Sequence, residues 1–179
     1  MLLFHYTSGR CLRGIARFGL TVGDVPTDIR HGKGRVGVWL TSAETGGGHG
    51  LESAAVDKTE YQLSVDIPDD APQLVRWTDW SAANATPETI GALTAAAAEH
   101  EGVGPSSWYI FFGVLSPDKI VRCVRTSDSL EIPNWGEASP PETDIKAVPA
   151  WRRDAWHRQL LKKVERALKH QQSPRVVRR

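Results

Sequence analysis

The sequence contains few cysteines and no long apolar run. Its two cysteines, Cys11 and Cys123, lie far apart, each in a segment that is expected to be buried. We therefore interpret both as inert core thiols, in preference to a disulfide or a nucleophile. The apolar runs fall far short of the roughly 20 residues that span a bilayer, and His5 interrupts the N-terminal one before the core of a signal peptide could form. These absences predict a cytoplasmic protein with no membrane partner.

The sequence also lacks the patterns of metal sites and of nucleotide hydrolases. His31 and His49 lie among glycines, without a set of Cys, His or Asp neighbours at metal-ligand spacing, so we expect no metal. The run Gly46-Gly47-Gly48-His49-Gly50 is not followed by the Lys-Ser or Lys-Thr pair that completes a phosphate-binding loop. By itself this run is weak support for a phosphate site.

Charge is balanced overall but uneven along the chain. The formal net charge of the 179 residues is +1. Residues 151–179 carry 10 Lys and Arg against 2 Asp and Glu, whereas residues 1–150 carry 12 against 19. With 40% hydrophobic and 24% charged residues, the composition suits one globular domain with its own core. The charge pattern adds a basic terminal arm to an acidic body.

Apolar periodicity predicts an α+β domain. Alternation indicates strands, most clearly at residues 59–67, where one face is expected to be core and the other exposed to water. Helical spacing flanked by cap residues, such as Ser8 and Gly19, indicates helices. The predicted strands cover residues 1–7, 36–42, 59–67, 107–112 and 120–124, and the predicted helices cover 8–18, 86–100 and the segment from 150 onward.

Two stretches lack this periodicity. Residues 21–37 collect glycines together with Arg30, Lys33 and Arg35, which predicts a long flexible basic loop. Residues 126–149 are expected to form an irregular wrap or linker. We therefore divide the chain into a domain over residues 1–125, the wrap or linker, and a basic amphipathic helix with a frayed tail over residues 150–179. The order of elements favours split mixed or antiparallel sheets with flanking helices.

The first predicted strand places two polar side chains on one face. Because side chains alternate along a strand, His5 and Thr7 point the same way, and the helix that follows makes a concave polar spot at the strand's end. His5 has two interpretations, a satisfied core histidine or a ligand-binding residue. Trp39, which shares a strand face with Thr41, is likewise either core or part of a site.

Three segments of the N-terminal half resemble a known fold. They are Leu3-Phe4-His5-Tyr6-Thr7, Ile15 to Gly19-Leu20, and Gly34 to Gly37-Val38-Trp39-Leu40-Thr41-Ser42. Their order and spacing resemble the first half of the ADP-ribosyltransferase fold, in which the poly(ADP-ribose) polymerase branch reads His-Gly-Ser, then Ile and Gly-Leu, then Gly-x-Tyr-Phe-Ala. The DarT-type DNA ADP-ribosyltransferases and the KptA-type RNA 2′-phosphotransferases open with a similar His-x-Thr pattern. Residues 107–112 and 117–120 are similar to the late strand and hairpin of the same fold.

The resemblance implies that the chain binds NAD as a substrate. By position, His5 would bind a ribose hydroxyl, Thr7 would fix the nicotinamide amide, and Trp39 would wall in the nicotinamide. Cationic side chains of the 21–37 loop would close over the pyrophosphate, since two phosphates suit a cationic loop. The NAD-binding residues implied in this way are His5, Tyr6, Thr7, Arg30, Lys33, Arg35, Trp39, Thr41 and Ser42.

One departure from the family pattern concerns catalysis. Many members carry a glutamate on the late strand, where this chain has Trp108, with Ser107 one residue earlier. Glu99 and Glu101, just upstream, are alternative sources of a carboxylate. The resemblance therefore implies an ADP-ribosyltransferase that modifies a nucleic acid or protein, or that hydrolyses NAD. Two alternatives remain, an RNA 2′-phosphotransferase-like enzyme and a non-catalytic binding or inhibitor module.

The C-terminal segment has an apolar stripe and a basic face. The stripe consists of Trp156, Leu160, Leu161, Val164 and Leu168. The basic face is either a solvated surface or a contact for nucleic acid. Its cations are Arg152, Arg158, Lys162, Lys163, Arg166 and Lys169.

Overall fold

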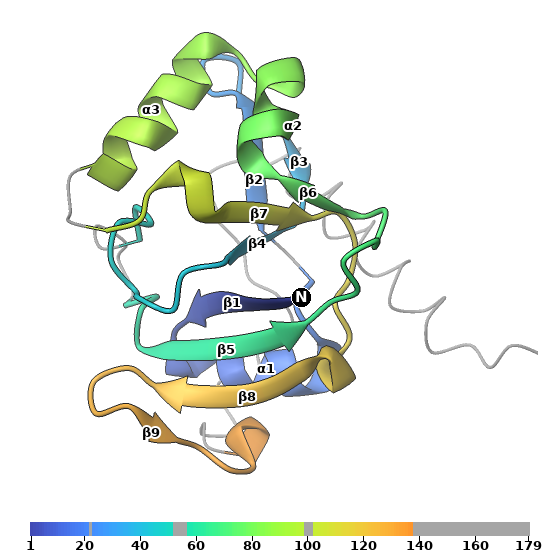
Figure 1. The fold of residues 1–179 in the computed structure, drawn as a ribbon, viewed down its shortest axis with the longest axis vertical. Coiled ribbons are helices and arrows are strands. Elements are labelled where there is room, and N and C mark those ends of the chain that lie inside the picture. The colour runs from blue at the N-terminus through green and yellow to red at the C-terminus, as the bar shows by residue number, and fades with distance from the viewer. Residues whose placement is uncertain (22, 52–56, 99–101, 138–179) are drawn as a thin grey trace, which may run out of the picture.

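Strand β1 (Leu2–Thr7) occupies the middle of a seven-stranded antiparallel sheet in the described part of the chain. The structure is a computed structural model that describes residues 1–21, 23–51, 57–98 and 102–137. These residues form an α+β fold in which the sheet order is β6-β7-β4-β1-β5-β8-β9 (Figure 1). The other strands of this sheet are β4 (Val38–Thr41), β5 (Tyr61–Asp66), β6 (Leu74–Arg76), β7 (Trp108–Phe111), β8 (Ile120–Arg125) and β9 (Leu130–Glu131). The predicted antiparallel α+β character is confirmed.

Strand pairing in the sheet is shortest between β1 and β4. On one side β1 pairs with β5 along its whole length, from Leu2–Asp66 to Thr7–Tyr61. On the other side, the register of β1 with β4 contains the Phe4–Thr41 pair alone within the described chain. The strands β6-β7-β4 and β1-β5-β8-β9 therefore form two parts that meet at one residue pair.

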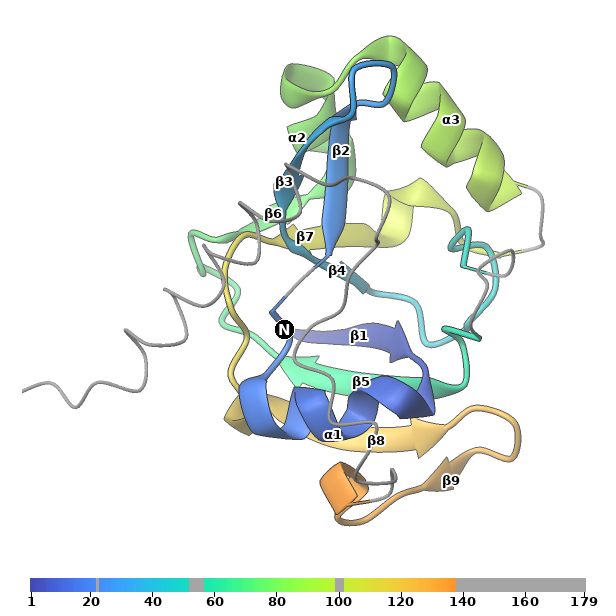
Figure 2. The same cartoon turned by 180° about the vertical axis from the view of Figure 1, so that it is seen from behind.

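Helix α1 (Gly9–Phe18) covers one face of β1, β5 and β8 (Figure 2). Its Leu12 and Ile15 pack into the core cluster that contains Leu3 of β1. Ser8 stands at the predicted N-cap position, but its side chain makes no cap hydrogen bond. The carboxylate of Glu60 accepts the Gly9 N–H instead, at 2.6 Å, which is favourable at the positive end of a helix.

Gly19 ends α1 as predicted, with a φ of +78°. A Cβ at this position would lie 2.1 Å from the Leu115 carbonyl oxygen. Both the left-handed backbone and the close approach require glycine.

Helices α2 (Trp77–Asn84) and α3 (Pro87–Ala98) pack near β6, β7 and β4. They close a second core cluster, in which Trp77 is 1% exposed and lies 5.1 Å from the ring of Trp39. Trp108 meets Trp39 edge-on at 5.7 Å. Trp77 and Trp80 are therefore packing residues. Periodicity did not predict α2 or β6, because both are short.

The prediction of a flexible loop over residues 21–37 is wrong. This stretch forms a two-stranded hairpin of β2 (Asp24–Asp28) and β3 (Lys33–Val36). Its turn is closed by Asp28, whose carboxylate accepts the His31 N–H at 3.2 Å and contacts His31 Nδ1 at 2.6 Å. Val25 is fully buried, and the backbone of Ile29 donates to Thr89 of α3 at 3.1 Å. Burial of one strand face and the anchored turn explain the order of this basic segment.

The prediction that one face of β5 is exposed to water is also wrong. Ser64 is 2% exposed, and Gln62 is 9% exposed on the face opposite the core residues Leu63 and Val65. Gln62 donates to the hydroxyl of Tyr6 at 2.8 Å and to the Glu44 carbonyl at 2.7 Å. A polar residue is stable there because the segment after β4 covers it and accepts its hydrogen bonds.

The chain after β8 also joins the fold. Beyond the short strand β9, a 3₁₀ turn at Trp135–Glu137 packs against α1. Two further 3₁₀ turns, at Pro105–Ser107 and Pro117–Lys119, precede β7 and β8. The predicted C-terminal helix, with Trp151 and its apolar stripe, lies outside the described residues. None of the described helices has the length and apolar character needed to cross a membrane.

Candidate functional site

His5 lies where β1 and β4 separate. Its Nδ1 is 2.9 Å from the carbonyl oxygen of Trp39 on β4. Because a carbonyl oxygen only accepts hydrogen bonds, Nδ1 carries the proton of the neutral ring, and Nε2 is left as an acceptor. The side chain therefore bridges the two parts of the sheet and presents one acceptor nitrogen.

The environment of His5 keeps the ring neutral. Burial lowers the pKa of His5 below its ordinary value of 6.5, because an imidazolium loses hydration there. The hydrogen bond to the Trp39 carbonyl raises the pKa by a smaller amount, and the positive charge of Lys58 lowers it further. At neutral pH, His5 is thus suited to accept a hydrogen bond from a hydroxyl group.

The backbone of Tyr6 faces the same separation. Within an antiparallel strand, the N–H and C=O of one residue point to the same neighbouring strand and alternate along the chain. The Ser42 N–H bonds to the Ser107 carbonyl beside β7, so the backbone of Thr41 points toward its partner Phe4. Tyr6, two residues beyond Phe4, must point the same way. If the pairing of β1 with β4 continued, the backbone of Tyr6 would form hydrogen bonds with that of Trp39. Instead, the Trp39 carbonyl accepts a hydrogen bond from the imidazole of His5.

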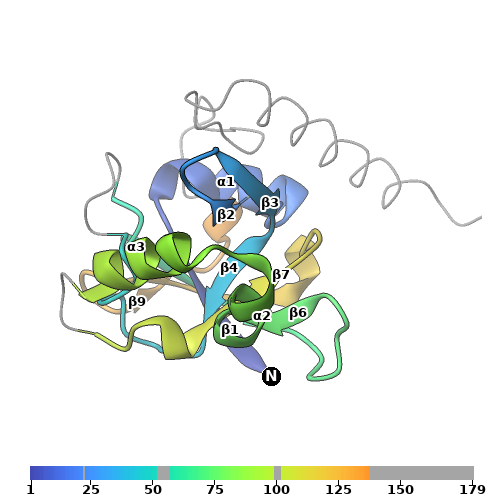
Figure 3. The same ribbon diagram turned by 90° about the horizontal axis from the view of Figure 1, so that it is seen from above.

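Helix α1 and the β2–β3 hairpin both lie near the point where β1 and β4 separate. Figures 2 and 3 show α1 against β1 and β5 and the hairpin beside β4, where Val25 belongs to the core cluster against which Trp39 packs. Leu3 packs against α1, so His5 and Thr7, which alternate with Phe4 and Tyr6, face the same side of β1. The predicted sharing of one face by His5 and Thr7 agrees with this register.

The other predicted site residues on β4 and just after it either form contacts within the fold or are exposed to solvent. The ring of Trp39 lies on the face of Phe4, opposite to His5, and its Nε1 donates to the Asp24 carbonyl at 2.8 Å. Thr41 donates to the Ser107 hydroxyl at 3.0 Å and accepts the Ala43 N–H at 3.1 Å. Ser42 is exposed. The backbone of Trp39, and not its indole, joins the site around His5.

Two of the three predicted cations on the hairpin have other partners in this structure. Arg30 forms an ion pair with Glu88 of α3. The guanidinium of Arg35 lies 4.3 Å from the ring centroid of Phe112, in a cation–π contact. Lys33 is exposed. Periodicity did not single out Lys58, the cation whose charge acts on His5, and the only available signal was its place just before the strand that pairs with β1.

Tyr6 uses its side chain to hold the glycine-rich segment after β4. Its hydroxyl donates to the Glu44 carbonyl at 2.6 Å, and its ring stacks on His49 at 5.4 Å. His49 in turn donates from Nε2 to the Thr45 carbonyl at 2.9 Å and accepts the indole N–H of Trp108 at 3.2 Å. Both ring nitrogens of His49 thus form hydrogen bonds within the protein. These bonds hold the glycine-rich segment beside Tyr6.

The late-strand position lies within the aromatic cluster. Trp108 is 6% exposed and serves as a packing residue between Trp39 and His49. Glu99 and Glu101 lie outside the described residues. No group of three or more His, Cys, Asp or Glu side chains in the described ranges is placed to hold a metal ion.

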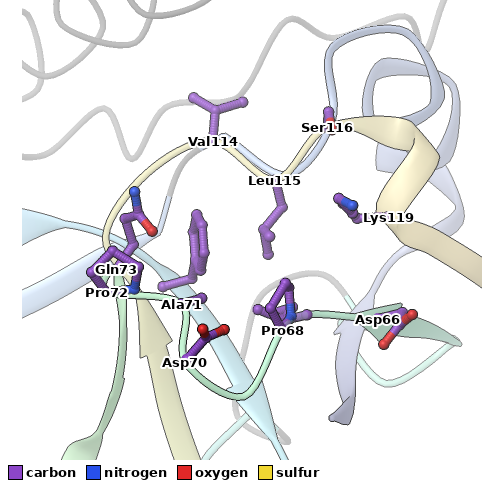
Figure 4. Close-up of a pocket in the computed structure, with 12 residues that line it drawn as sticks. Asp66, Pro68, Asp70, Ala71, Pro72, Gln73, Val114, Leu115, Ser116 and Lys119 are labelled. Carbon is purple, nitrogen blue, oxygen red and sulfur yellow. The ribbon is translucent and has the colours of Figure 1, made fainter.

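A cavity of about 370 Å³ lies at the other end of β1, away from His5 (Figure 4). It is bordered by Asp66, the β5 partner of Leu2, and by residues on both sides of Leu115. None of the predicted site residues lines it.

No protein-family model, no curated protein and no solved structure matches this chain.

Proposed function

We propose that the chain has an ADP-ribosyltransferase-like fold, binds NAD where β1 and β4 separate, and transfers ADP-ribose to a macromolecule or to water. The observation that carries this proposal is the state of His5. Its Nδ1–H is held by the Trp39 carbonyl, and its lowered pKa leaves Nε2 as a neutral acceptor. A ribose hydroxyl is the kind of donor that such a nitrogen binds.

The neighbouring groups suit the rest of the dinucleotide. A nicotinamide carboxamide has an NH₂ group and a carbonyl, which complement the carbonyl and N–H of Tyr6 at the separated strand edge. The hydroxyl of Thr7 lies on the same face as His5 and is a further partner for the amide. The resemblance assigns the pyrophosphate to Arg30, Lys33 and Arg35, since two phosphates suit cationic side chains.

The reaction breaks one bond and forms one. The glycosidic bond between C1′ of the ribose and the nicotinamide nitrogen breaks, and its electron pair neutralises the pyridinium as nicotinamide leaves. A lone pair of the acceptor oxygen or nitrogen attacks C1′, and the acceptor's proton passes to solvent or to a base on the acceptor. The protein's part is to hold NAD bent and to orient the ribose, with His5 binding a ribose hydroxyl.

The proposal assigns no carboxylate to β7. Trp108 is buried in that strand and hydrogen-bonded to His49, so the late-strand glutamate of many family members has no counterpart there. Polarisation of the acceptor then falls to the acceptor itself or to water. Nucleic acid fits as the acceptor, because the basic C-terminal segment complements phosphates.

Incubation with labelled NAD tests the proposal. Wild-type protein, His5→Ala and His31→Ala are compared, each alone and with DNA, RNA or a protein lysate, and nicotinamide release and label transfer are followed. His31 is an exposed histidine on the hairpin turn and serves as the matched control. We expect release by wild type and His31→Ala and at least a tenfold loss in His5→Ala, about 1.4 kcal/mol of transition-state binding. Wild-type protein that neither binds NAD nor releases nicotinamide would overturn the proposal in favour of a non-catalytic module.

A further inference from the structure

The cavity at the far end of β1 has an apolar floor and an open, acidic rim. It is formed where the chain leaves β5, at residues 66–73, and where it passes from β7 to β8, at residues 111–119. Ile67 and Leu115 are buried at its base, while Asp66 and Asp70 are exposed at its edge. Figure 4 shows the side chains of Leu115 and Pro68 pointing toward each other across it. At about 370 Å³, it falls in the size range of pockets that take a ligand or several side chains.

The charge of the rim favours a cation. Neither Asp66 nor Asp70 takes part in an ion pair among the described residues. Lys119 also lines the cavity, but its ammonium lies 4.0 Å from the carboxylate of Asp118, which offsets its charge. An occupant that matches both floor and rim combines apolar side chains with flanking positive charges.

The chain itself contains a segment of this chemistry. Residues 151–179 carry 10 Lys and Arg against 2 Asp and Glu. Within them, Leu160, Leu161, Val164 and Leu168 form the predicted apolar stripe, with cations on either side. This segment complements the acidic rim and the apolar floor at once.

The end of the described chain brings this segment within reach of the cavity. Gly136 packs so closely on α1 that an added Cβ would lie 2.5 Å from the side chain of Ala16. Helix α1 ends at Phe18, and Leu20, two residues later, pairs with Leu115 of the cavity. Residues 138–155 span up to about 60 Å when extended, whereas a domain of this size has a radius of gyration of about 14 Å.

We propose that the C-terminal segment around residues 156–169 docks into this cavity of the same chain, with its apolar stripe on the floor and its cations at Asp66 and Asp70. The tether gives the segment a high local concentration, so a weak intrinsic affinity suffices. Phosphates of a nucleic acid compete with the two carboxylates for the same cations. Docking therefore restrains polyanion binding by the tail, and a polyanion releases the tail. This inference does not depend on NAD binding.

Photocrosslinking in the full chain tests the docking. The exposed Gln73 at the cavity edge is replaced by p-benzoylphenylalanine, and crosslinked peptides are identified by mass spectrometry. The same replacement at Thr94, exposed on α3, is the position control. We expect intramolecular crosslinks from position 73 to residues 156–169 and few from position 94. The double variant Asp66→Lys and Asp70→Lys should lower their yield about fivefold or more, whereas Asp79→Lys on α2 should not.

Three results would overturn the proposal. They are equal tail crosslinking from positions 73 and 94, a yield that the charge reversal leaves unchanged, and products found only between two chains. Thermal unfolding of each variant shows whether it has folded. If the double variant does not fold, the same comparison is made with the tail substitutions Leu160→Asp and Leu161→Asp in the otherwise native chain, which should also abolish the crosslinks.

Discussion

Replacing His5 separates its role in the fold from its role in a site. His5→Ala removes the hydrogen bond to the Trp39 carbonyl, whereas His5→Asn places an amide N–H close to the position of Nδ1 and keeps that bond. A net hydrogen bond contributes about 0.5–1.5 kcal/mol, and a buried carbonyl left without a partner costs about 1–3 kcal/mol. Because His5 is only half-buried and water can reach the vacated space, we expect His5→Ala to lower the free energy of unfolding by about 1–2 kcal/mol. His5→Asn should lose less than half of that.

The same variants predict a pH dependence with a definite sign. The pKa of His5 is lower in the folded state than its ordinary value of 6.5, so the unfolded chain binds more protons as the pH falls below 6.5. Stability from the neutral ring is fully present above pH 6.5 and is lost as the pH falls toward the folded pKa. The slope for one group is at most about 1.4 kcal/mol per pH unit. The advantage of wild type over His5→Ala should therefore shrink below pH 6.5.

Urea unfolding followed by tryptophan fluorescence measures these differences at pH 7.5 and at pH 5.5. The difference between wild type and His5→Ala at the two pH values cancels the titration of all other groups. Equal stability of wild type and His5→Ala at pH 7.5 would refute the hydrogen bond across the separated strands. A difference that grows at pH 5.5 would refute the neutral state of the ring.

Three further predictions follow from the packing. Tyr6→Phe removes the hydroxyl that accepts a hydrogen bond from Gln62 and donates one to the Glu44 carbonyl. It should lower the free energy of unfolding, measured in urea, by about 1–3 kcal/mol. A double-mutant cycle with Gln62→Leu should show coupling between the two side chains. Gly91→Ala should raise the free energy of unfolding by about 0.5–1 kcal/mol, because the residue lies within α3 and its Cβ would meet nothing within 4 Å; a lower melting temperature would contradict this. Burial raises the pKa of Cys123 to about 11, so its thiol should resist alkylation at pH 8 in the native protein and react only after unfolding, as read by mass spectrometry.

The strands and helices with long periodic patterns could be predicted from the sequence. The first strand, the helix after it and the alternating strand at Tyr61–Asp66 occur where the pattern placed them. The hairpin at residues 24–36 could not, because its order comes from contacts of Val25 and Ile29 with elements distant in sequence. The burial of Gln62 could not be predicted for the same reason, because the segment that covers it follows β4 and is distant from it in sequence.

The candidate site could be predicted only in part. Alternation placed His5 and Thr7 on one face, but it could not show that the imidazole bonds to a backbone carbonyl of β4, which depends on how two strands separate. Nor could it show that the indole of Trp39 turns to the opposite face, because this follows from the Phe4–Thr41 register.

The most direct test of the central claim is NAD binding and turnover by His5→Asn. This variant keeps the bond to the Trp39 carbonyl and removes the acceptor nitrogen that the proposal assigns to ribose. Calorimetric titration with NAD and an assay of nicotinamide release are run on wild type and on the variant, after urea unfolding has shown that the variant is folded. We predict that wild type binds and cleaves NAD and that the folded variant loses at least tenfold in both. Equal NAD binding and turnover by the two proteins, or neither in wild type, would contradict a role for His5 as the ribose-binding residue of an ADP-ribosyltransferase.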